Sequence, residues 1–97
     1  HMRKYEMVVI LDPSIDERTV DTTFEKLIKV VPAEGGTVDN TDVWGKRKFA
    51  YEIDKKQEGI YVVLNFTSKP ETAKELDRQL GLNEVVLRTK LMRVDEK

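Results

Sequence analysis

The sequence has no cysteine and a single histidine, His1. His1 followed by Met2 is typical of a cloning remnant, so we take Met2 as the natural start and leave His1 out of the reasoning. The remaining chain offers no thiol nucleophile, no disulfide, no Cys/His zinc site and no histidine general base. We therefore expect neither a metal nor a cofactor.

Long apolar runs are also lacking. No stretch approaches the roughly 20 apolar residues that a membrane-spanning helix needs, and no signal peptide is recognisable. At 97 residues, of which 39% are apolar and 36% charged, the chain has the length and composition of one folded domain. We therefore expect a single soluble domain over residues 2–97, located in the cytoplasm and without a membrane partner.

The sequence also lacks an excess of positive or of negative residues, because its formal net charge is −1. The two signs are unevenly distributed: residues 1–42 carry five Lys/Arg against nine Asp/Glu, and residues 43–97 carry twelve against nine. A protein that binds nucleic acid on its own is usually strongly basic. The balance argues against a large independent RNA footprint but permits a local basic patch.

Apolar periodicity predicts four strands and two helices. Ser14 and Asp16 compete as the N-cap of the first helix, and Pro32 is expected to end that helix. Gly45 indicates a bulge or a bend inside the second strand. The predicted strands are Tyr5–Leu11, Thr37–Ile53, Ile60–Phe66 and Val85–Val94, the helices lie within residues 14–31 and 68–81, and residues 54–59 form a polar connector.

This order of elements is typical of the ferredoxin-like, split-βαβ arrangement (βαββαβ). It is an α+β fold in which two helices cover one face of a four-stranded antiparallel sheet. The other face has no cover from this chain. Apolar side chains on that face indicate a surface for a protein partner, although scattered exposed apolar residues need no partner. The residues expected there are Val8, Ile10, Tyr61 and Val63.

The stretch WGKRK at residues 44–48 comes nearest to a phosphate-binding loop. It has only one glycine and lies within a predicted strand, whereas such a loop joins a strand to a helix. Acidic pairs such as Asp16 and Glu17 fall at helix starts, where carboxylates favour the positive end of the helix dipole. Since no nucleophile or base is recognisable, we predict that the protein is not an enzyme and has no small-molecule substrate.

Contact with RNA is compatible with the predicted sheet. RNA-recognition-motif domains share this order of elements and stack bases on strand aromatics, but only Tyr61 would offer such a ring on the open face. Cations could contact phosphates, and a solvated strand surface is the alternative reading for each of them. The last strand neighbours the first in this fold, so we expect Arg3 near the cations of the last strand. The candidate cations are Arg3, Lys46, Arg47, Lys48, Arg88, Lys90 and Arg93.

Three segments resemble the bacterial small-subunit ribosomal protein S6 family. They are MRKYEMVVILDP from residue 2, WGKRKFAYEIDKKQEGIYVV from residue 44, and LDRQLGLNEVVLRTKLMR from residue 76. The resemblance spans residues 2–93, and the fold of that family is the ferredoxin-like one. It implies a structural role in the small ribosomal subunit, in which the protein binds the central domain of 16S ribosomal RNA together with ribosomal protein S18 during assembly.

The resemblance also implies roles for individual residues. Arg3, Tyr5 and Arg88 match positions expected at the RNA, and residues 46–48 match a basic strand segment that contacts RNA or the partner. Many family members continue the first helix to a glycine, so Pro32 predicts that this helix ends a turn early here. Two other functions stay open: a protein-interaction module of the same fold without RNA contact, and a regulatory ligand-binding domain.

Overall fold

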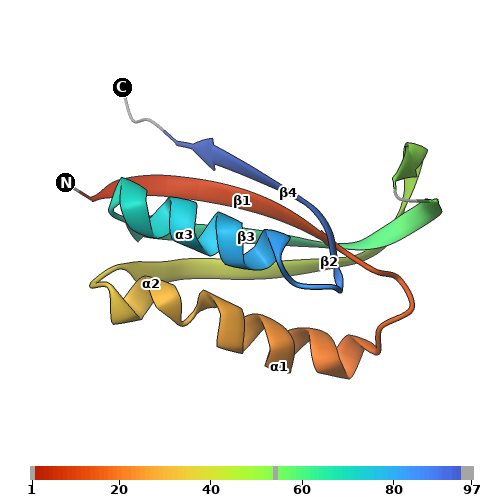
Figure 1. Ribbon diagram of the computed structural model, residues 1–97, viewed down its shortest axis with the longest axis horizontal. Coiled ribbons are helices and arrows are strands. Elements are labelled where there is room, and N and C mark those ends of the chain that lie inside the picture. Colours follow the sequence, from red (N-terminus) through yellow and green to blue (C-terminus); the bar gives the residue numbers. More distant parts are fainter. Residues whose placement is uncertain (1, 54, 95–97) are drawn as a thin grey trace.

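The computed structural model describes residues 2–53 and 55–94. Four strands form one antiparallel sheet in the order β2-β3-β1-β4, and the helices lie together on one side of it (Figure 1). The predicted ferredoxin-like fold is confirmed. The elements are β1 (Arg3–Leu11), α1 (Glu17–Ile28), α2 (Val30–Ala33), β2 (Thr37–Ile53), β3 (Lys56–Ser68), α3 (Pro70–Gly81) and β4 (Val86–Arg93).

The core lies between the sheet and the helices. On β1, Met7 and Val9 have no exposed surface and Leu11 is 3% exposed, because these alternating side chains all point toward the helices. On β3, Leu64 pairs with Met7 and Val62 pairs with Val9, and both are fully buried. The period-2 pattern of the sequence therefore decides which face of each strand enters the core.

Helix α1 begins at the second of its two candidate caps. The Asp16 side chain accepts a hydrogen bond from the Arg18 backbone N–H at 2.9 Å. Ser14 instead donates its hydroxyl and its backbone N–H to Asp12, at 2.7 and 2.8 Å. Asp16 thus satisfies one of the free N–H groups at the helix start. Further along, Val20 and Phe24 enter the core.

Pro32 interrupts the helical path without ending it. Helix α1 ends at Ile28, and a second short helix, α2, contains Pro32 itself. Because proline has no N–H, it cannot bond the carbonyl four residues earlier, which is that of Ile28. The expectation that Pro32 itself ends the first helix is therefore wrong, because α1 already ends at Ile28 and Pro32 lies inside α2. Gly35, at φ +86°, completes the turn into β2.

The polar connector predicted over residues 54–59 is much shorter. Strand β3 begins at Lys56, which pairs with Ile53, and Lys55 directly before it has φ +64°. Residues 46–53 and 55–59 thereby form a hairpin arm that projects past the end of the sheet (Figure 1). The arm carries both strands away from the cover of the helices.

Candidate nucleic-acid and protein interface

The strand register defines which residues lie on the open face, the side of the sheet turned away from the helices. Ile10 lies between Tyr61 of β3 and Arg88 of β4, and Val8 lies between Val63 and Lys90. The neighbouring residue on β4, Thr89, donates a hydrogen bond to Asp77 of α3 at 2.6 Å and so points to the helices. Arg88 and Lys90 consequently point to the open face.

The open face is less exposed than the sequence predicted. Val8 and Tyr61 are half-buried, but Ile10 is only 8% exposed and Val63 only 6%. The expectation that all four residues present bare apolar surface is therefore wrong. Cross-strand neighbours cover part of this surface, because long aromatic and cationic side chains on the same face shield the short ones between them.

Three aromatic rings gather on this face and form what we call the aromatic cluster: Trp44, Phe49 and Tyr61. The Trp44 and Tyr61 ring centroids are 6.4 Å apart with an interplanar angle of 11°, and those of Phe49 and Tyr61 are 6.1 Å apart at 54°. The Arg47 guanidinium carbon lies 5.7 Å from the centroid of the Trp44 ring, within cation–π range. Tyr61 is the central ring of the cluster.

A bulge brings Trp44 to this position. The pairing of β2 with β3 shifts between Val43 and Gly45, and Gly45 has φ +86°, which confirms the predicted irregularity. The Trp44 ring is held in place by its Nε1–H, which donates to the Asp42 carboxylate at 2.9 Å. Trp44 remains 49% exposed, yet the sequence reasoning did not name it as a functional residue. The sequence feature that could have identified Trp44 is its position directly before Gly45, because bulges often reorient a neighbouring side chain.

Phe49 folds back from the hairpin arm over a residue that has no side chain. A Cβ atom on Gly59 would lie 2.7 Å from both Ile10 Cγ2 and Phe49 Cζ. Only glycine leaves room for these two side chains to meet above the strand, since real Cβ atoms do not approach so closely. The arm is thereby tied to the open face through Phe49.

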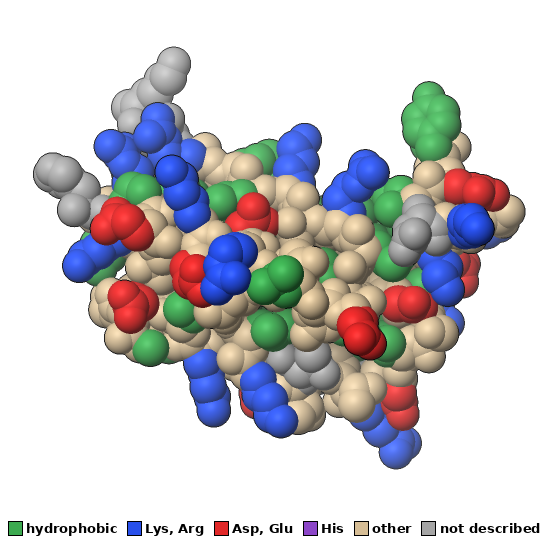
Figure 2. All heavy atoms as spheres, viewed as in Figure 1, with side chains coloured by type: hydrophobic (Ala, Val, Ile, Leu, Met, Phe, Trp, Pro, Cys, Tyr) green, Lys and Arg blue, Asp and Glu red, His purple; other side chains and the backbone are tan. Residues whose placement is uncertain are grey.

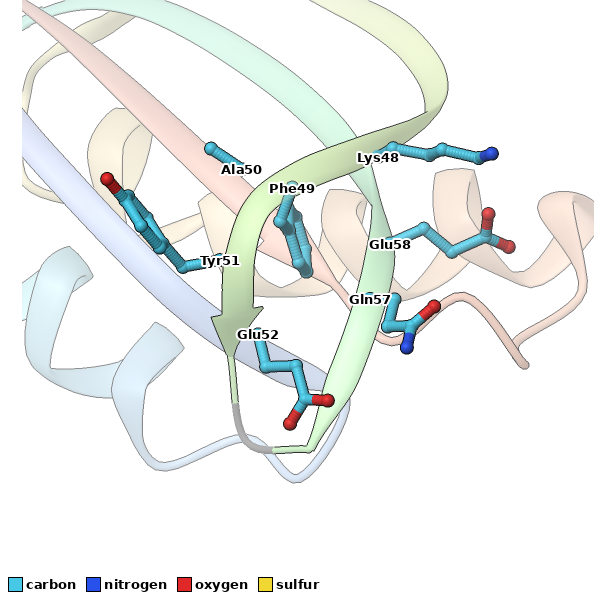
Figure 3. A pocket seen from close by; sticks show the side chains of 7 residues that line it. All are labelled: Lys48, Phe49, Ala50, Tyr51, Glu52, Gln57 and Glu58. Atoms are coloured by element: carbon cyan, nitrogen blue, oxygen red, sulfur yellow. The ribbon is translucent and has the colours of Figure 1, made fainter.

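The arm also encloses a shallow hollow of about 480 Å³ (Figure 3). Lys48 and Glu58, which are paired across the two strands, point the same way at its rim, and Tyr51 points away from them. Tyr51 is 85% exposed. A second hollow, of about 250 Å³, is lined by residues 48–53 together with Tyr61 and Arg88. A cation of β4 therefore shares a concave surface with the aromatic cluster.

The predicted cations divide into separate groups. Arg47, Arg88 and Lys90 belong to the open face, whereas Lys46 pairs with the core residue Ile60 and so points to the helix side. All of these cations are exposed. The basic stretch of residues 46–48 thus supplies cations to both sides of the arm.

Arg3 and Arg93 lie at the far end of the sheet. Arg93 pairs with Tyr5, while Arg88 pairs with Ile10. Ile10 lies seven positions after Arg3 along β1, which corresponds to about 23 Å of strand. The prediction that Arg3 lies near Arg88 and Lys90 is therefore wrong, and of the predicted cations of β4 only Arg93 belongs to the same end of the sheet as Arg3. Figure 2 shows Lys and Arg side chains gathered at this end, where β1 begins and β4 ends (Figure 1).

Tyr5 is a core residue. It is 7% exposed, and its ring stacks on Phe66 with the centroids 5.4 Å apart. It shares a strand face with Met7, which points to the helices. The expectation that the Tyr5 ring offers itself to RNA needs correction, because the ring is already packed inside the protein.

The groups with shifted pKa values lie away from the open face. Hydrogen bonds from Ser14 lower the pKa of Asp12, and the Arg78 side chain lowers the pKa of Glu75 to about 2, with a further contribution from Gln79. These are ordinary hydrogen-bonded surface carboxylates. Within residues 2–53 and 55–94, no group of three or more acidic or histidine side chains could hold a metal ion, and no helix is long and apolar enough to cross a membrane.

Comparison with known proteins places this geometry in a family. Residues 4–93 match the family described as "Ribosomal protein S6". The small ribosomal subunit protein bS6 of Beutenbergia cavernae is 62% identical over 94 residues, which are 97% of this chain and 98% of that protein. The protein of the same name from Arthrobacter sp. is 57% identical over 95 residues, covering 98% and 94%.

Solved structures agree with the sequence comparison. The crystal structure of 30S ribosomal protein S6 from Thermotoga maritima matches with a TM-score of 0.87 and 29% identity, covering 97% of this chain and 89% of that one. The C-terminal domain of the MgtC protein from Mycobacterium tuberculosis matches with a TM-score of 0.66 at 14% identity over 96% of this chain and 88% of that one, which reflects a shared fold alone.

Proposed function

The chain belongs to the ribosomal protein S6 family, and from this membership we propose that it binds the central domain of 16S ribosomal RNA together with ribosomal protein S18 and supports assembly of the small subunit. As a member of this family it is a ribosomal protein of the small subunit and not an enzyme. We also propose that residues 2–97 act as one domain; His1, taken above as a cloning remnant, lies outside the described residues.

The observation that carries the proposal is the shared location of cations and aromatic rings. Arg47, Arg88 and Lys90 lie on the same face as the aromatic cluster, and Arg88 lines a hollow together with Tyr61. Cations neutralise RNA phosphates, and aromatic rings stack on unpaired bases. The same rings and the apolar side chains beside them also suit a protein neighbour.

The charge of the chain supports a joint footprint with a partner. A net charge of −1 gives little long-range attraction to RNA, whereas a small number of exposed cations on one face can still contact phosphates. A second, more basic protein would supply the remaining attraction. RNA binding by the pair should therefore be much tighter than RNA binding by this chain alone.

A gel-shift titration tests this proposal. The central domain of 16S ribosomal RNA is titrated with this protein, with S18, and with both, and an RNA of equal length and unrelated sequence serves as the control. We expect a specific shift with both proteins at concentrations where this protein alone gives none. If the pair bound the two RNAs equally, or if this protein added nothing to the binding by S18, the proposed function would be wrong.

The alternative is a protein-interaction module of the same fold that does not touch RNA. The nearly bare Tyr51 on the hairpin arm favours it, because an exposed aromatic ring is typical of protein-binding surfaces. The two functions differ in one measurement. Under the alternative, S18 binds this protein, but substitution of Arg88 and Lys90 leaves the affinity of the pair for RNA unchanged.

A further inference from the structure

A hollow on the helix side of the sheet belongs to neither the open face nor the hairpin arm. Helices α2 and α3 lie against each other there (Figure 1), and between them is a hollow of about 480 Å³, which we call the acidic hollow. It shares no lining residue with the hollows of the arm. Of the described residues that line it, three are glutamates and none is Lys or Arg. The lining residues are Val30, Glu34, Glu71, Thr72, Glu75 and Gln79.

The three carboxylates of the acidic hollow differ in their partners. Glu75 is occupied, because its carboxylate accepts hydrogen bonds from Arg78 Nε and Nη2 at 2.9 and 2.7 Å. Glu34 follows the end of α2, and Glu71 lies in the first turn of α3. Within residues 2–53 and 55–94, neither of these two side chains has a hydrogen-bond or ion-pair partner. The hollow thus brings together two negative charges from two helices, and like charges that share a site favour the binding of a cation.

Thr72 supplies an observation that is independent of these charges. It is 4% exposed, and its hydroxyl has no hydrogen-bond partner in the part of the chain that the structure describes. Ser68, which is buried just before α3, instead donates its hydroxyl to the Lys69 carbonyl at 2.9 Å. A largely buried polar group normally has a partner, and no fully enclosed side-chain oxygen of the described residues lacks one. The Thr72 hydroxyl therefore opens into the hollow that Thr72 lines, where it can accept a hydrogen bond from a ligand.

We propose that the acidic hollow binds the guanidinium group of an arginine from a basic protein segment, with Glu34, Glu71 and the Thr72 hydroxyl as its acceptors. A guanidinium carries five N–H donors in a planar fork, so it can bond several acceptors at the same time. The Arg78 side chain already binds one carboxylate of this hollow in that way, through two of its nitrogens. This contact goes beyond the binding of RNA and S18 and does not depend on either.

The chemistry of the lining favours this ligand over other classes. RNA is disfavoured, because the carboxylates of the hollow repel phosphates. A metal ion is disfavoured as well, since no group of three or more acidic or histidine side chains among the described residues could hold one. A lysine or a polyamine offers ammonium groups, which are more strongly hydrated than a guanidinium. The weakly hydrated plane of a guanidinium can also lie against the apolar side chain of Val30.

An NMR titration of the protein alone tests the site. The probe is the tripeptide Gly-Arg-Gly with both ends blocked, and Gly-Lys-Gly and spermidine are compared with it. We expect saturable shifts of the Glu71, Thr72 and Gln79 amides with the arginine peptide, and binding of the lysine peptide that is weaker by about threefold or more. Absence of these shifts would overturn the inference, and tighter binding of spermidine than of the arginine peptide would overturn it in favour of a polyamine. Because neither S18 nor RNA is present, such a failure leaves the proposed function intact.

Matched substitutions separate the hollow from general effects of charge. Glu34→Gln combined with Glu71→Gln should weaken binding of the arginine peptide by about fivefold or more. The control combines Glu25→Gln with Glu84→Gln, which removes two exposed carboxylates outside the lining and should keep binding within about twofold. Thr72→Val keeps the shape of the side chain but removes the hydroxyl, and should weaken binding about threefold. Equal losses in the two double variants, or unchanged binding by Thr72→Val, would contradict the inference.

Cross-linking in assembled small subunits tests whether the ligand is a protein segment. The chain has no cysteine, so Lys74→Cys introduces a single thiol on α3, directly before Glu75. A photoreactive group on this thiol should capture a segment that contains arginine, and capture should fall by about fivefold or more when Glu34→Gln and Glu71→Gln are added. The same group at Arg18→Cys on α1 is the control and should not capture that segment. No capture, capture that does not depend on the two glutamates, or capture of a second copy of this chain would overturn the inference.

Discussion

Tyr5 and Phe66 stack on each other across β1 and β3, with ring centroids 5.4 Å apart and planes at 24°. The pair lies on the helix side of the sheet and belongs to the same core cluster as Met7 and Leu64. Offset aromatic pairs of this kind add about 0.5–1.5 kcal/mol beyond the burial of their area. The pair therefore anchors the start of β1, and with it the end of the sheet where Arg3 and Arg93 lie.

The first prediction separates this structural role of Tyr5 from a role in RNA binding. Tyr5→Phe keeps the ring, so the free energy of unfolding should change by no more than about 0.5 kcal/mol, and the affinity of the protein pair for RNA should not change. Tyr5→Ala removes a buried ring and should cost about 3–5 kcal/mol. Urea unfolding and filter binding measure the two quantities. A severalfold loss of RNA affinity in Tyr5→Phe at unchanged stability would return Tyr5 to the RNA-binding set.

The second prediction concerns the salt dependence of RNA binding. Each phosphate contact that is removed should lower the slope of log affinity against log salt by about one. Arg88→Ala and Arg3→Ala should each have this effect, and the double variant should lose about two, because distant sites act independently. The control is Lys69→Ala with Lys74→Ala, two exposed cations at the start of α3 on the helix side of the sheet. An unchanged slope in Arg88→Ala, or an equal loss in the control, would show that Arg88 does not contact phosphate.

The sequence predicted the order of elements because each element carries its own local signals. Pro70 at the first turn and Gly81 at the last mark α3, and alternating apolar residues mark β1 and the centre of β3. The length of the hairpin arm had no such signal. Residues 56–59 read KQEG, and such polar residues have low strand propensity. Pairing with the other strand of the arm keeps them extended, and that pairing is a tertiary contact which local patterns do not contain.

The candidate site was predictable in part. Strand alternation correctly assigned Val8, Ile10, Tyr61 and Val63 to the open face, but it carried no information about side chains that fold over them. Ile10 Cγ2 and Phe49 Cζ both lie close to the position that a Cβ atom of Gly59 would occupy, and no periodicity encodes that approach of the arm to the open face. The resemblance to a family suggested that Tyr5 meets RNA, while alternation along β1 groups it with the core. For Tyr5 the alternation of side chains along β1 agrees with the structure, in which the ring lies in the core.

The third prediction follows from the depressed pKa of Glu75. Arg78, whose Nη2 lies 2.7 Å from the Glu75 carboxylate, lowers that pKa to about 2 from an ordinary value of 4.5, and Gln79 contributes a smaller part. A lowered pKa stabilises the folded state above the ordinary value, and this stabilisation is lost as the pH falls from about 4.5 to about 2. The difference in stability between the natural protein and Glu75→Gln should therefore shrink over this range.

NMR titration of the Glu75 carboxyl group measures the same effect directly. Its midpoint should lie near 2 in the natural protein and move back toward 4.5 in Arg78→Ala, whereas Gln79→Ala should produce a smaller shift. Lys74→Ala provides the control, since it removes a cation from the same helix that makes no contact with Glu75 among those described. A midpoint near 4.5 in the natural protein would contradict the ion pair between Glu75 and Arg78.

The fourth prediction contrasts two glycines that are required for different reasons. Gly45 has φ +86°, but a Cβ atom added there would meet no other atom within 4 Å. Gly59 has no positive φ, but a Cβ atom added there would lie 2.7 Å from two side-chain carbons. Gly45→Ala should cost roughly 1–2 kcal/mol of stability through backbone strain. Gly59→Ala should cost about 1–3 kcal/mol through overpacking. Chemical denaturation measures both values.

Asparagine substitutions show which cause operates at each position. Asn tolerates positive φ better than Ala does, so Gly45→Asn should be the more stable of the two variants at that site. At Gly59 the order should reverse, because the larger side chain displaces Phe49 and Ile10 further. Displacement of Phe49 should also disturb the aromatic cluster, and a change in the fluorescence of Trp44 would report it. The same order of Ala and Asn at both positions would show that a single cause, either strain or crowding, explains both glycines.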